Sequence, residues 1–307
     1  MTASAPCVSI VMSVLNGESF LREALDSILN QTFRDWELVV INNASTDGTA
    51  AILASYDDPR IVCLRNNSVL SLPASLNIGI KIARAPLIAR LDADDLALPE
   101  RLSLQVQFME AHPEVALLGT WWNMFWVGDD GQPIIRPAPE TPTEHEELVE
   151  RLASTNPMGH PTLIYRRDAV RAVGCYDESF VFAQDWALVI EISRRFRLAC
   201  LPLRLTHWRI HPAQLSSKPS WKRVRLEDMV ILHRRALAHP ELSPRGRKAG
   251  LRALGGCYMR LSLSVLRQGE LFKAVRIILC GIVTVPARIW FDILWTYGQR
   301  ACTRRSP

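Results

Sequence analysis

The C-terminal region of the sequence lacks a long hydrophobic run, although it is mostly apolar. The longest uncharged stretch between residues 271 and 298 is residues 277–287, which is 11 residues long. A helix of that length spans about 16 Å, too little for a hydrocarbon core of about 30 Å. Residues 1–6 also lack the basic and apolar regions of a signal peptide. Neither a transmembrane helix nor a cleaved leader is therefore expected.

Cysteine motifs and strong charge are missing as well. The seven cysteines are scattered, odd in number and without C-x-x-C spacing. This pattern is typical of reduced thiols in a cytoplasmic protein and argues against structural zinc. The net charge of +5 comes without a basic patch interleaved with aromatic residues, so nucleic acid is not an expected partner. Much of the basic excess lies after Lys218.

What the sequence does contain is an alternation of strands and helices. Runs that are apolar at nearly every position indicate strands covered on both faces, and each is followed by helical periodicity. This alternation predicts right-handed βαβ units and a parallel sheet. The expected strands are residues 7–15, 36–41, 60–64 and 85–90, and the expected helices are residues 18–30, 49–56 and 73–84.

The fourth of these strands leads into three carboxylates. Asp92 and Asp94 are two residues apart, which in an extended chain places them on one side, and Asp95 follows directly. Burying them together without a cation would cost many kcal/mol. A solvated loop or helix cap is one interpretation. A Mg²⁺ or Mn²⁺ ion, held by the carboxylates and a substrate phosphate, is the other.

Polar turns also follow two other strands of the predicted sheet. Asn16 comes after the first strand, and Asn42 and Asn43 end the second. Ligands of such sheets bind beyond the carboxyl ends of the strands. We therefore expect these side chains to meet Asp92 and Asp94 along one edge. That convergence favours the metal interpretation.

The second half of the chain continues the mixed pattern and then becomes helical. Residues 128–142 are rich in Gly, Pro and Asp, which predicts a hairpin or loop. From Trp221 onward only helical periodicity is evident. The other expected helices are residues 102–111, 144–152 and one opening at 182–186, and the other expected strands are residues 115–122, 160–166 and 201–210.

An ordered set of short motifs runs through residues 7–216. They are Val8–Val11 with Asn16–Glu18, Ser45–Thr49, Leu76–Ile80, Ala89–Asp95 with Pro99, Arg101, Leu102 and Gln105, His160-Pro161, Gly174–Asp177, Gln184-Asp185, and Arg209–His211 with Gln214 and Ser216. None is decisive alone. Together they resemble the family 2 glycosyltransferases, inverting enzymes with a GT-A fold that use nucleotide-diphosphate sugars.

The resemblance implies a GT-A type α/β fold, a Rossmann-like, mainly parallel sheet flanked by helices. We expect this domain over residues 1–217 and a helical C-terminal extension over residues 218–307. It also implies a nucleotide-sugar donor and a glycan or lipid-linked glycan acceptor. A catalytically weakened binding subunit of the same fold is the first rival hypothesis. A nucleotidyltransferase is the second, although no Gly-rich phosphate loop follows the first strand.

The resemblance also assigns the donor site. It implies that Asn16, Glu18 and Asn43 hold the base and ribose. Asp92 would face the ribose, and Asp94 would bind Mn²⁺ or Mg²⁺ on the diphosphate. A divalent cation there would stabilise the leaving group as the glycosidic bond breaks. The alternatives are that Glu18 is only a first-turn helix acid and Asn43 only a turn residue.

Asp185 is the catalytic base that the resemblance implies. Inverting transfer needs a carboxylate that takes the proton of the acceptor hydroxyl. The alternative is a helix-start acid favoured by the helix dipole. His211 is a metal or phosphate ligand in some relatives, or else an ordinary loop histidine here. His160, beside Pro161, is interpreted as structural.

The chain departs from the family pattern at three places. Asn42 and Asn43 stand where two aspartates are usual, and an amide can donate as well as accept a hydrogen bond. A uracil or thymine base is still expected, with the Asn43 oxygen accepting from its N3–H. Gln184 replaces the usual glutamate beside the base, which removes a negative charge. Ser13 stands where proline is common.

The C-terminal tail predicts an amphipathic helix with a kink at Pro286. Residues 271–294 place most of their large apolar side chains on one face and Lys273, Arg276, Arg288 and Asp292 on the other. Such a helix is typical of the membrane interface, here the inner face of the cell membrane. The alternative is a helix packed on the catalytic domain.

Overall fold

The computed structural model describes residues 5–214 and 222–294 of the chain. The chain forms two compact units. The first contains the chain up to residue 148 together with residues 157–214, and we call it the sheet unit. The second contains residues 149–156 together with the chain from residue 215, and we call it the helical unit.

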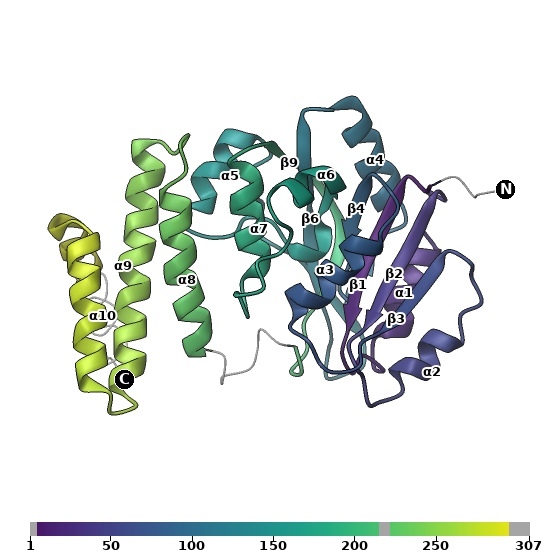
Figure 1. The fold of residues 1–307 in the computed structure, drawn as a ribbon, viewed down its shortest axis with the longest axis horizontal. Helices are drawn as coiled ribbons and strands as arrows, with labels where there is room; N and C mark the ends of the chain where they lie inside the picture. The colour runs from purple at the N-terminus through teal and green to yellow at the C-terminus, as the bar shows by residue number, and fades with distance from the viewer. Residues whose placement is uncertain (1–4, 215–221, 295–307) are drawn as a thin grey trace. The chain divides into compact units, whose positions relative to one another are not determined.

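A nine-stranded mixed sheet forms the centre of the sheet unit (Figure 1). The strand order is β3, β2, β1, β4, β8, β6, β9 and β5, with β7 paired to β6. Pairs among β1 to β4 are parallel, as is β6 with β9, which confirms the mainly parallel α/β prediction. The strands are β1 (Val8–Val14), β2 (Trp36–Asn42), β3 (Ile61–Arg65), β4 (Leu87–Arg90), β5 (Leu96–Ala97), β6 (Val115–Val127), β7 (Pro133–Pro137), β8 (Ile164–Arg166) and β9 (Arg197–Arg209).

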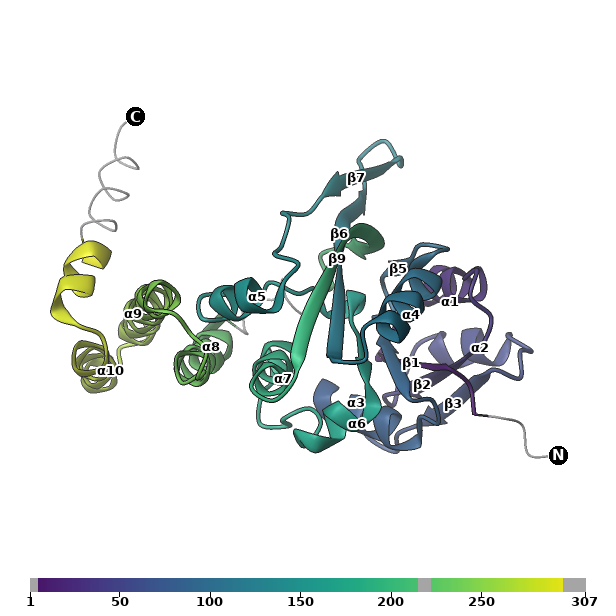
Figure 2. The same ribbon diagram turned by 90° about the horizontal axis from the view of Figure 1, so that it is seen from above.

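Helices cover both faces of the parallel strands, which explains why these strands are apolar at nearly every position. Ile10 and Met12 of β1 belong to a core cluster with α1 (Leu21–Leu29). Val11, one position out of phase, faces Gly79 of the helix α3 on the opposite side (Figure 2). The helices are α1, α2 (Thr49–Ala54), α3 (Leu72–Ile82), α4 (Arg101–Ala111), α5 (His145–Leu152), α6 (Arg167–Ala172) and α7 (Gln184–Ser193).

The hairpin expected at residues 128–142 is confirmed, but the strand before it is longer than expected. β6 continues past residue 122 to Val127 because β7 pairs with it from Asn123 onward. β9 likewise begins at Arg197 and not at residue 201, since its first residues pair with the start of β6.

The strand expected over residues 160–166 is only partly formed. His160–Thr162 is a 3₁₀ turn, and β8 occupies the last three residues. Pro161 has no N–H to donate to a neighbouring strand, which disfavours a regular ladder there. β8 runs antiparallel to β4, so the row of neighbouring parallel strands that begins at β3 ends at β4.

The helical unit contains α8 (Lys222–Leu237), α9 (Pro244–Leu266) and α10 (Leu271–Thr284), with α9 between the other two (Figure 2). α10 stops before Pro286, and a helical segment resumes at residues 287–294. The predicted interruption at Pro286 is therefore confirmed.

The single apolar face expected along residues 271–294 is wrong. Ile289, Trp290 and Ile293 pack into a core with Leu254 and Tyr258 of α9. The large apolar residues of α10 before the break mostly remain exposed. The interruption at Pro286 changes the direction in which the two segments present their side chains, which a continuous helical projection cannot anticipate.

No helix within residues 5–214 and 222–294 combines the length and the apolar character needed to cross a membrane.

Candidate active site

Three parallel strands bring three polar turns to one edge of the sheet. β1 lies between β2 and β4, with Val14 aligned with Asn42 and Val11 aligned with Arg90. The turns that follow these strands therefore share an edge, as the sequence predicted. Asn16, Asn43 and Asp92 lie in these turns.

The carboxylates after β4 lie in a turn and not in an extended strand, which corrects the premise that placed Asp92 and Asp94 on one side. β4 ends at Arg90, and the N–H of Asp95 donates to the carbonyl of Asp92 at 3.2 Å. Asp92 pairs with Arg90, whereas Asp94 lies against His211. The turn therefore gives each carboxylate a different partner.

The partner of Asp92 is a fully buried arginine. The Arg90 guanidinium pairs with Oδ1 of Asp92 and donates to the carbonyls of Val11 at 2.5 Å and Leu91 at 2.8 Å. Burial alone would raise the pKa of Asp92, but the charge of Arg90 and its hydrogen bond hold that pKa below its ordinary value. Asp92 is thus an anion, and its side chain remains 29% exposed.

Asp94 has less compensation for its charge. Its Oδ2 lies 3.0 Å from Nε2 of His211. Burial and the negative charge of Asp92 raise the pKa of Asp94, and His211 offsets only part of that shift. Nδ1 of His211 is buried without a hydrogen-bond partner. The pair therefore has unused capacity for a positively charged ligand.

Asp95, the third carboxylate, is completely buried. Its Oδ1 accepts a hydrogen bond from the N–H of Arg209 at 2.7 Å, and its Oδ2 has no partner. Burial, followed by the charges of Asp94 and Asp92, raises the pKa of Asp95 well above its usual range. Its environment therefore favours the neutral acid.

Arg209 connects the carboxylate turn to the start of α1. It donates from Nε to the carbonyl of Asp94 and from Nη2 to Glu23, both at 2.8 Å. Its guanidinium lies over the Phe20 ring, 4.6 Å from the centroid, where a cation is favoured. The His211 ring also lies 4.6 Å from that of Phe20. The end of β9 is thereby fixed against both Asp94 and α1.

Asn16 and Glu18 are held by the loop after β2. Asn16 has a positive φ of 54°, and its Oδ1 accepts from the N–H of Thr46 at 2.9 Å. The Oε2 of Glu18 accepts from the N–H of Gly48 at 2.7 Å. Both side chains are exposed. They join the turn after β1 to the loop after β2.

Asn43 is buried and extensively hydrogen-bonded. Its Oδ1 accepts from Nδ2 of Asn66 at 2.8 Å and from the N–H of Leu70 at 2.9 Å. Its Nδ2 donates to the carbonyl of Leu70 at 2.9 Å. Both oxygen lone pairs are used, so this amide holds the segment around Leu70, and one N–H is left for another acceptor.

Asp185 lies on α7, the helix that precedes β9 in the chain. It lies in the first turn of α7. Burial raises the pKa of Tyr176 well above its usual range, and the nearby charge of Asp185 adds to that shift. The Tyr176 hydroxyl lies 2.7 Å from Nε2 of His160, which also accepts from Nε of Arg90 at 3.2 Å. Hydrogen-bond contacts thus join Tyr176 and His160 to the Arg90–Asp92 pair, and the charge of Asp185 acts on Tyr176.

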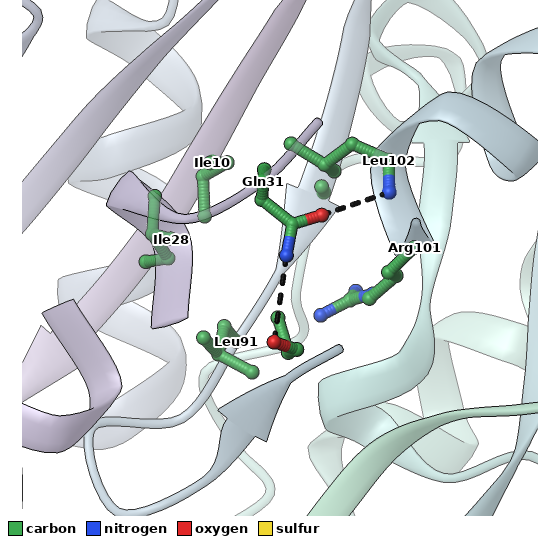
Figure 3. Close-up of a pocket in the computed structure, with 8 residues that line it drawn as sticks. Ile10, Ile28, Gln31, Leu91, Arg101 and Leu102 are labelled. Carbon is green, nitrogen blue, oxygen red and sulfur yellow. Dashed lines mark hydrogen bonds between the residues drawn. The ribbon is translucent and has the colours of Figure 1, made fainter. Parts of the chain in front are cut away.

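A layer of residues supports the carboxylate turn from the core side (Figure 3). Gln31 donates from Nε2 to the carbonyl of Leu98 at 2.8 Å and accepts from the N–H of Leu102 at 3.0 Å. Arg101 donates to the carbonyl of Arg90 at 2.6 Å. A small cavity adjoins these groups, and its other walls are the apolar Ile10, Ile28, Ala89, Leu91 and Ala97. It belongs to the core and is not a donor site.

The sequence analysis assigned no role to Arg90 or Arg209 and interpreted His160 only as structural. The signal for Arg90 was present, because a cation inside an otherwise apolar strand requires an anionic partner nearby. Asp92 is the nearest such group in the sequence. Arg209 stands in the motif Arg209–His211, but its partners are distant along the chain, so the sequence does not indicate what it contacts.

The side chains at this edge supply too few ligand atoms to hold a divalent cation unless oxygens of the substrate also bind it. Within the described residues, no three His, Cys, Asp or Glu side chains are grouped to hold a metal ion. Asp94 and His211 provide one oxygen-bearing and one nitrogen-bearing side chain. A cation would offset the surplus negative charge that raises the pKa of Asp94. Phosphate oxygens and water would complete the coordination, as is usual for Mg²⁺ at nucleotides.

Comparison with known proteins identifies close sequence relatives. The family model described as glycosyl transferase family 2 matches residues 9–174. An uncharacterized glycosyltransferase of Haemophilus influenzae is 30% identical over 223 residues, covering 70% of this chain and 68% of the relative. EpsE of Bacillus subtilis, a putative glycosyltransferase, is 37% identical over 178 residues, covering 56% and 61%. The Escherichia coli UDP-Glc:alpha-D-GlcNAc-diphosphoundecaprenol beta-1,3-glucosyltransferase WfaP is 34% identical over 103 residues, covering 34% and 41%.

Solved structures share the fold at lower identity. The S. aureus TarS 1-349 complex with UDP-GlcNAc has a TM-score of 0.69 at 19% identity, covering 92% of this chain and 82% of the TarS 1-349 chain. The mannosyltransferase PcManGT of Pyrobaculum calidifontis, in complex with GDP-Man and Mn²⁺, has a TM-score of 0.62 at 16% identity, covering 98% and 81%. At these identities the likeness concerns the fold alone.

Proposed function

Since this chain belongs to glycosyl transferase family 2, we propose that it moves a sugar from a UDP or dTDP donor to a hydroxyl of a glycan or lipid-linked glycan, with inversion. Nucleotide-sugar glycosyl transfer is the activity of the family. The donor, the acceptor and the stereochemical course are our proposal. The observation that carries it is the run of contacts from Asp92 through Arg90 and His160 to Tyr176, on which the charge of Asp185 acts.

The donor half of the proposed site is the edge formed by the three polar turns. Asp92 is anionic and partly exposed, which suits it to accept hydrogen bonds from ribose hydroxyls. Asn16 and Glu18 shape the turn beside it. Asn43 contributes by fixing the segment around Leu70, and its remaining N–H is free to donate to the base. In this proposal base recognition does not need the Asn43 oxygen.

Asp94 and His211 would hold Mn²⁺ or Mg²⁺ together with the diphosphate. Their charge and hydrogen-bonding capacity are incompletely met within the protein. When bound, the ion stabilises the negative charge that develops on the departing diphosphate. Arg209 keeps both residues against the start of α1, through the carbonyl of Asp94 and the shared contact with Phe20.

Asp185 is proposed as the general base. Its carboxylate takes the proton of the acceptor hydroxyl while the hydroxyl oxygen bonds to the anomeric carbon. The bond from that carbon to the diphosphate oxygen breaks, and the nucleoside diphosphate leaves. Burial and the Arg90 charge lower the pKa of His160 to about 3. His160, which lies between Tyr176 and Arg90, is therefore neutral and adds no competing acid.

The donor base and the acceptor class draw on the names of relatives. WfaP is named for a UDP-Glc donor and a diphosphoundecaprenol-linked acceptor, and TarS was solved with UDP-GlcNAc. The PcManGT structure, in contrast, contains GDP-Man. We assign a UDP or dTDP donor to this chain and a glycan on a lipid carrier as the leading acceptor. Such an acceptor lies at a membrane.

The experiment that tests this proposal is the substitution Asp185→Asn, which keeps the shape and removes the proton acceptor. UDP release from UDP-glucose and UDP-GlcNAc with Mn²⁺ is measured across pH, with water as the probe acceptor. We expect release to fall by roughly 10²–10⁴ while UDP binding is retained. In the parent protein, release should rise with pH through one ionisation.

Asp168→Asn is the matched control. Asp168 is also a first-turn helix acid, in α6, but β8 and β4 are antiparallel and place it beyond the opposite edge of the sheet. It should therefore leave UDP release unchanged. Near-normal release by Asp185→Asn would exclude the base role. A parent protein that binds UDP but releases none from any UDP- or dTDP-sugar would instead be a binding subunit.

A further inference from the structure

The outer surface of α10 is apolar although the helix has already packed on its own unit. Phe272 is 92% exposed and Val283 is 88% exposed. Single exposed apolar residues are ordinary on protein surfaces, but a continuous group on one element is a sign of an interaction site. The exposed apolar residues of α10 are Leu271, Phe272, Val275, Leu279, Ile282 and Val283. We call them the α10 surface.

The side of α10 that packs inward carries smaller residues. Ala274 and Gly281 are buried, with Ile277 and Ile278 half-buried between them. A Cβ at Gly281 would lie 2.8 Å from the Trp290 ring, so this approach requires glycine. The helix therefore makes its close contacts through Ala274 and Gly281 and leaves six large apolar residues outward, unlike an ordinary surface helix, which turns such residues inward.

Basic residues border the α10 surface. At about 100° per residue, the six apolar positions occupy an arc of roughly 120°. Arg276 and Lys273 follow on the next part of the circumference, and both are exposed. Lys273 lies 3.6 Å from Glu270, while Arg276 extends the basic border toward solvent. An apolar arc with a basic margin is typical of helices that lie in a membrane interface.

The charge of the chain is divided between its two parts. Residues 215–307 contain 18 Lys and Arg against 5 Asp and Glu, whereas residues 1–214 contain 18 against 26. The α10 surface thus belongs to the strongly basic part. Pairing with the same surface of a second copy would bring two such basic parts together and be opposed by repulsion. An anionic surface would be attracted.

We propose that the α10 surface inserts into the headgroup region of an anionic lipid bilayer, with Lys273 and Arg276 at the lipid phosphates. α10 has 14 residues and is about 21 Å long. It would lie along the interface and not across the membrane. This binding does not depend on sugar transfer, although it would bring the proposed active site to lipid-linked acceptors.

The test is flotation of the full-length protein with two kinds of vesicle, pure phosphatidylcholine and phosphatidylcholine with 25% phosphatidylglycerol. We expect binding to the anionic vesicles only, weakening as NaCl rises. Phe272→Ser combined with Val283→Ser should weaken that binding at least tenfold, since two large apolar side chains no longer enter the interface. Lys273→Glu with Arg276→Glu should also weaken it.

The matched control combines Val69→Ser with Val127→Ser in the sheet unit. Both valines are 58% exposed, so this variant also replaces two exposed apolar side chains by serine, but outside the α10 surface. This control should float like the parent protein. Circular dichroism and UDP-dependent stabilisation, measured on every variant, separate loss of lipid binding from loss of fold or of the donor site.

Three results would overturn the proposal. The first is a parent protein that does not float with anionic vesicles. The second is a Phe272→Ser, Val283→Ser variant that floats as well as its parent. The third is a parent protein that self-associates in light scattering and becomes monomeric only in that variant, which would make the α10 surface a contact between copies.

Discussion

At the scale of single residues, the proposed site depends on positive charge buried beneath the carboxylates. Arg90 has no exposed surface, and its guanidinium is used by Asp92 and two backbone carbonyls. The same charge acts on His160, which accepts from Nε of Arg90. A second proton on that imidazole would place two cations in contact. The structure therefore fixes His160 as neutral and Asp92 as charged.

The neutral state of His160 predicts a pH dependence of stability. Its pKa is lowered to about 3 in the folded chain from 6.5, so between these values the unfolded chain binds one more proton. The free energy of unfolding should therefore rise with pH in that window, by about 1.4 kcal/mol per unit from this residue. His160→Gln should remove this contribution, which urea unfolding between pH 4.5 and 6.5 would measure.

His233→Gln provides a comparison in the helical unit. Burial lowers the pKa of His233 to about 4, so the same sign applies over a narrower window. His233→Gln should therefore also reduce the rise of the free energy of unfolding with pH, but less so toward pH 4. An unchanged slope in His160→Gln would mean that this imidazole is protonated in the folded chain.

The positions of the polar residues could be predicted from the sequence, but their partners could not. Asn16, Asn43 and Asp92 were expected at one edge because each follows a parallel strand. The partners depend on contacts far along the chain, such as Leu70 with Asn43 and Arg209 with Asp95. For this reason the Asn43 oxygen, expected to be open to a base, is already used by its neighbours.

At the scale of elements, close approach between a helix and the sheet sets how the parallel strands are covered. A Cβ at Gly79 of α3 would lie 2.5 Å from Cγ1 of Val11, below any normal contact. Gly79→Ala should therefore push α3 away from β1 and lower the free energy of unfolding by about 1–3 kcal/mol. Urea unfolding measures the change.

Gly256→Ala should have the opposite sign. Gly256 lies within α9, and nothing is within 4 Å of a Cβ placed there. Alanine should therefore stabilise the helix by about 0.5–1 kcal/mol. If both substitutions stabilised the protein, the packing of α3 on β1 would be looser than described.

The parallel elements could be predicted from the sequence because βαβ units have local signals. Apolar runs identify buried strands, and the helices between them follow from periodicity. The two-residue β5 has no such signal, and neither has the antiparallel direction of β8, since both depend on pairing with β9 and β4. The bounds of β6 and β9 depend on each other in the same way.

At the scale of the whole molecule, donor binding should be visible as stabilisation of the folded chain. With Mn²⁺, UDP or dTDP should raise the melting temperature more than GDP does, because the proposal assigns them the tighter binding. A ligand at 100 times its Kd adds about 2.7 kcal/mol to the free energy of unfolding. Asp94→Ala should remove the Mn²⁺-dependent part and leave the metal-independent part. Differential scanning fluorimetry would measure both.

Asp129→Ala is the control for charge removal. It removes an exposed carboxylate beside the β6–β7 hairpin and should behave like the parent protein. Equal or larger stabilisation by GDP would contradict the assignment of the donor base. An Asp94→Ala protein with full Mn²⁺ dependence would place the metal elsewhere.

The buried, unpaired oxygen of Asp95 bears on how related sequences should be compared. A carboxyl whose surroundings favour the neutral acid contributes shape and one hydrogen-bond acceptor, and asparagine supplies both. A homologue with Asp-x-Asp-Asn at this turn would therefore keep the same arrangement. One that lost the arginine two positions before the first aspartate would not. Arg90 is therefore a better marker of this site in related sequences than Asp95 is.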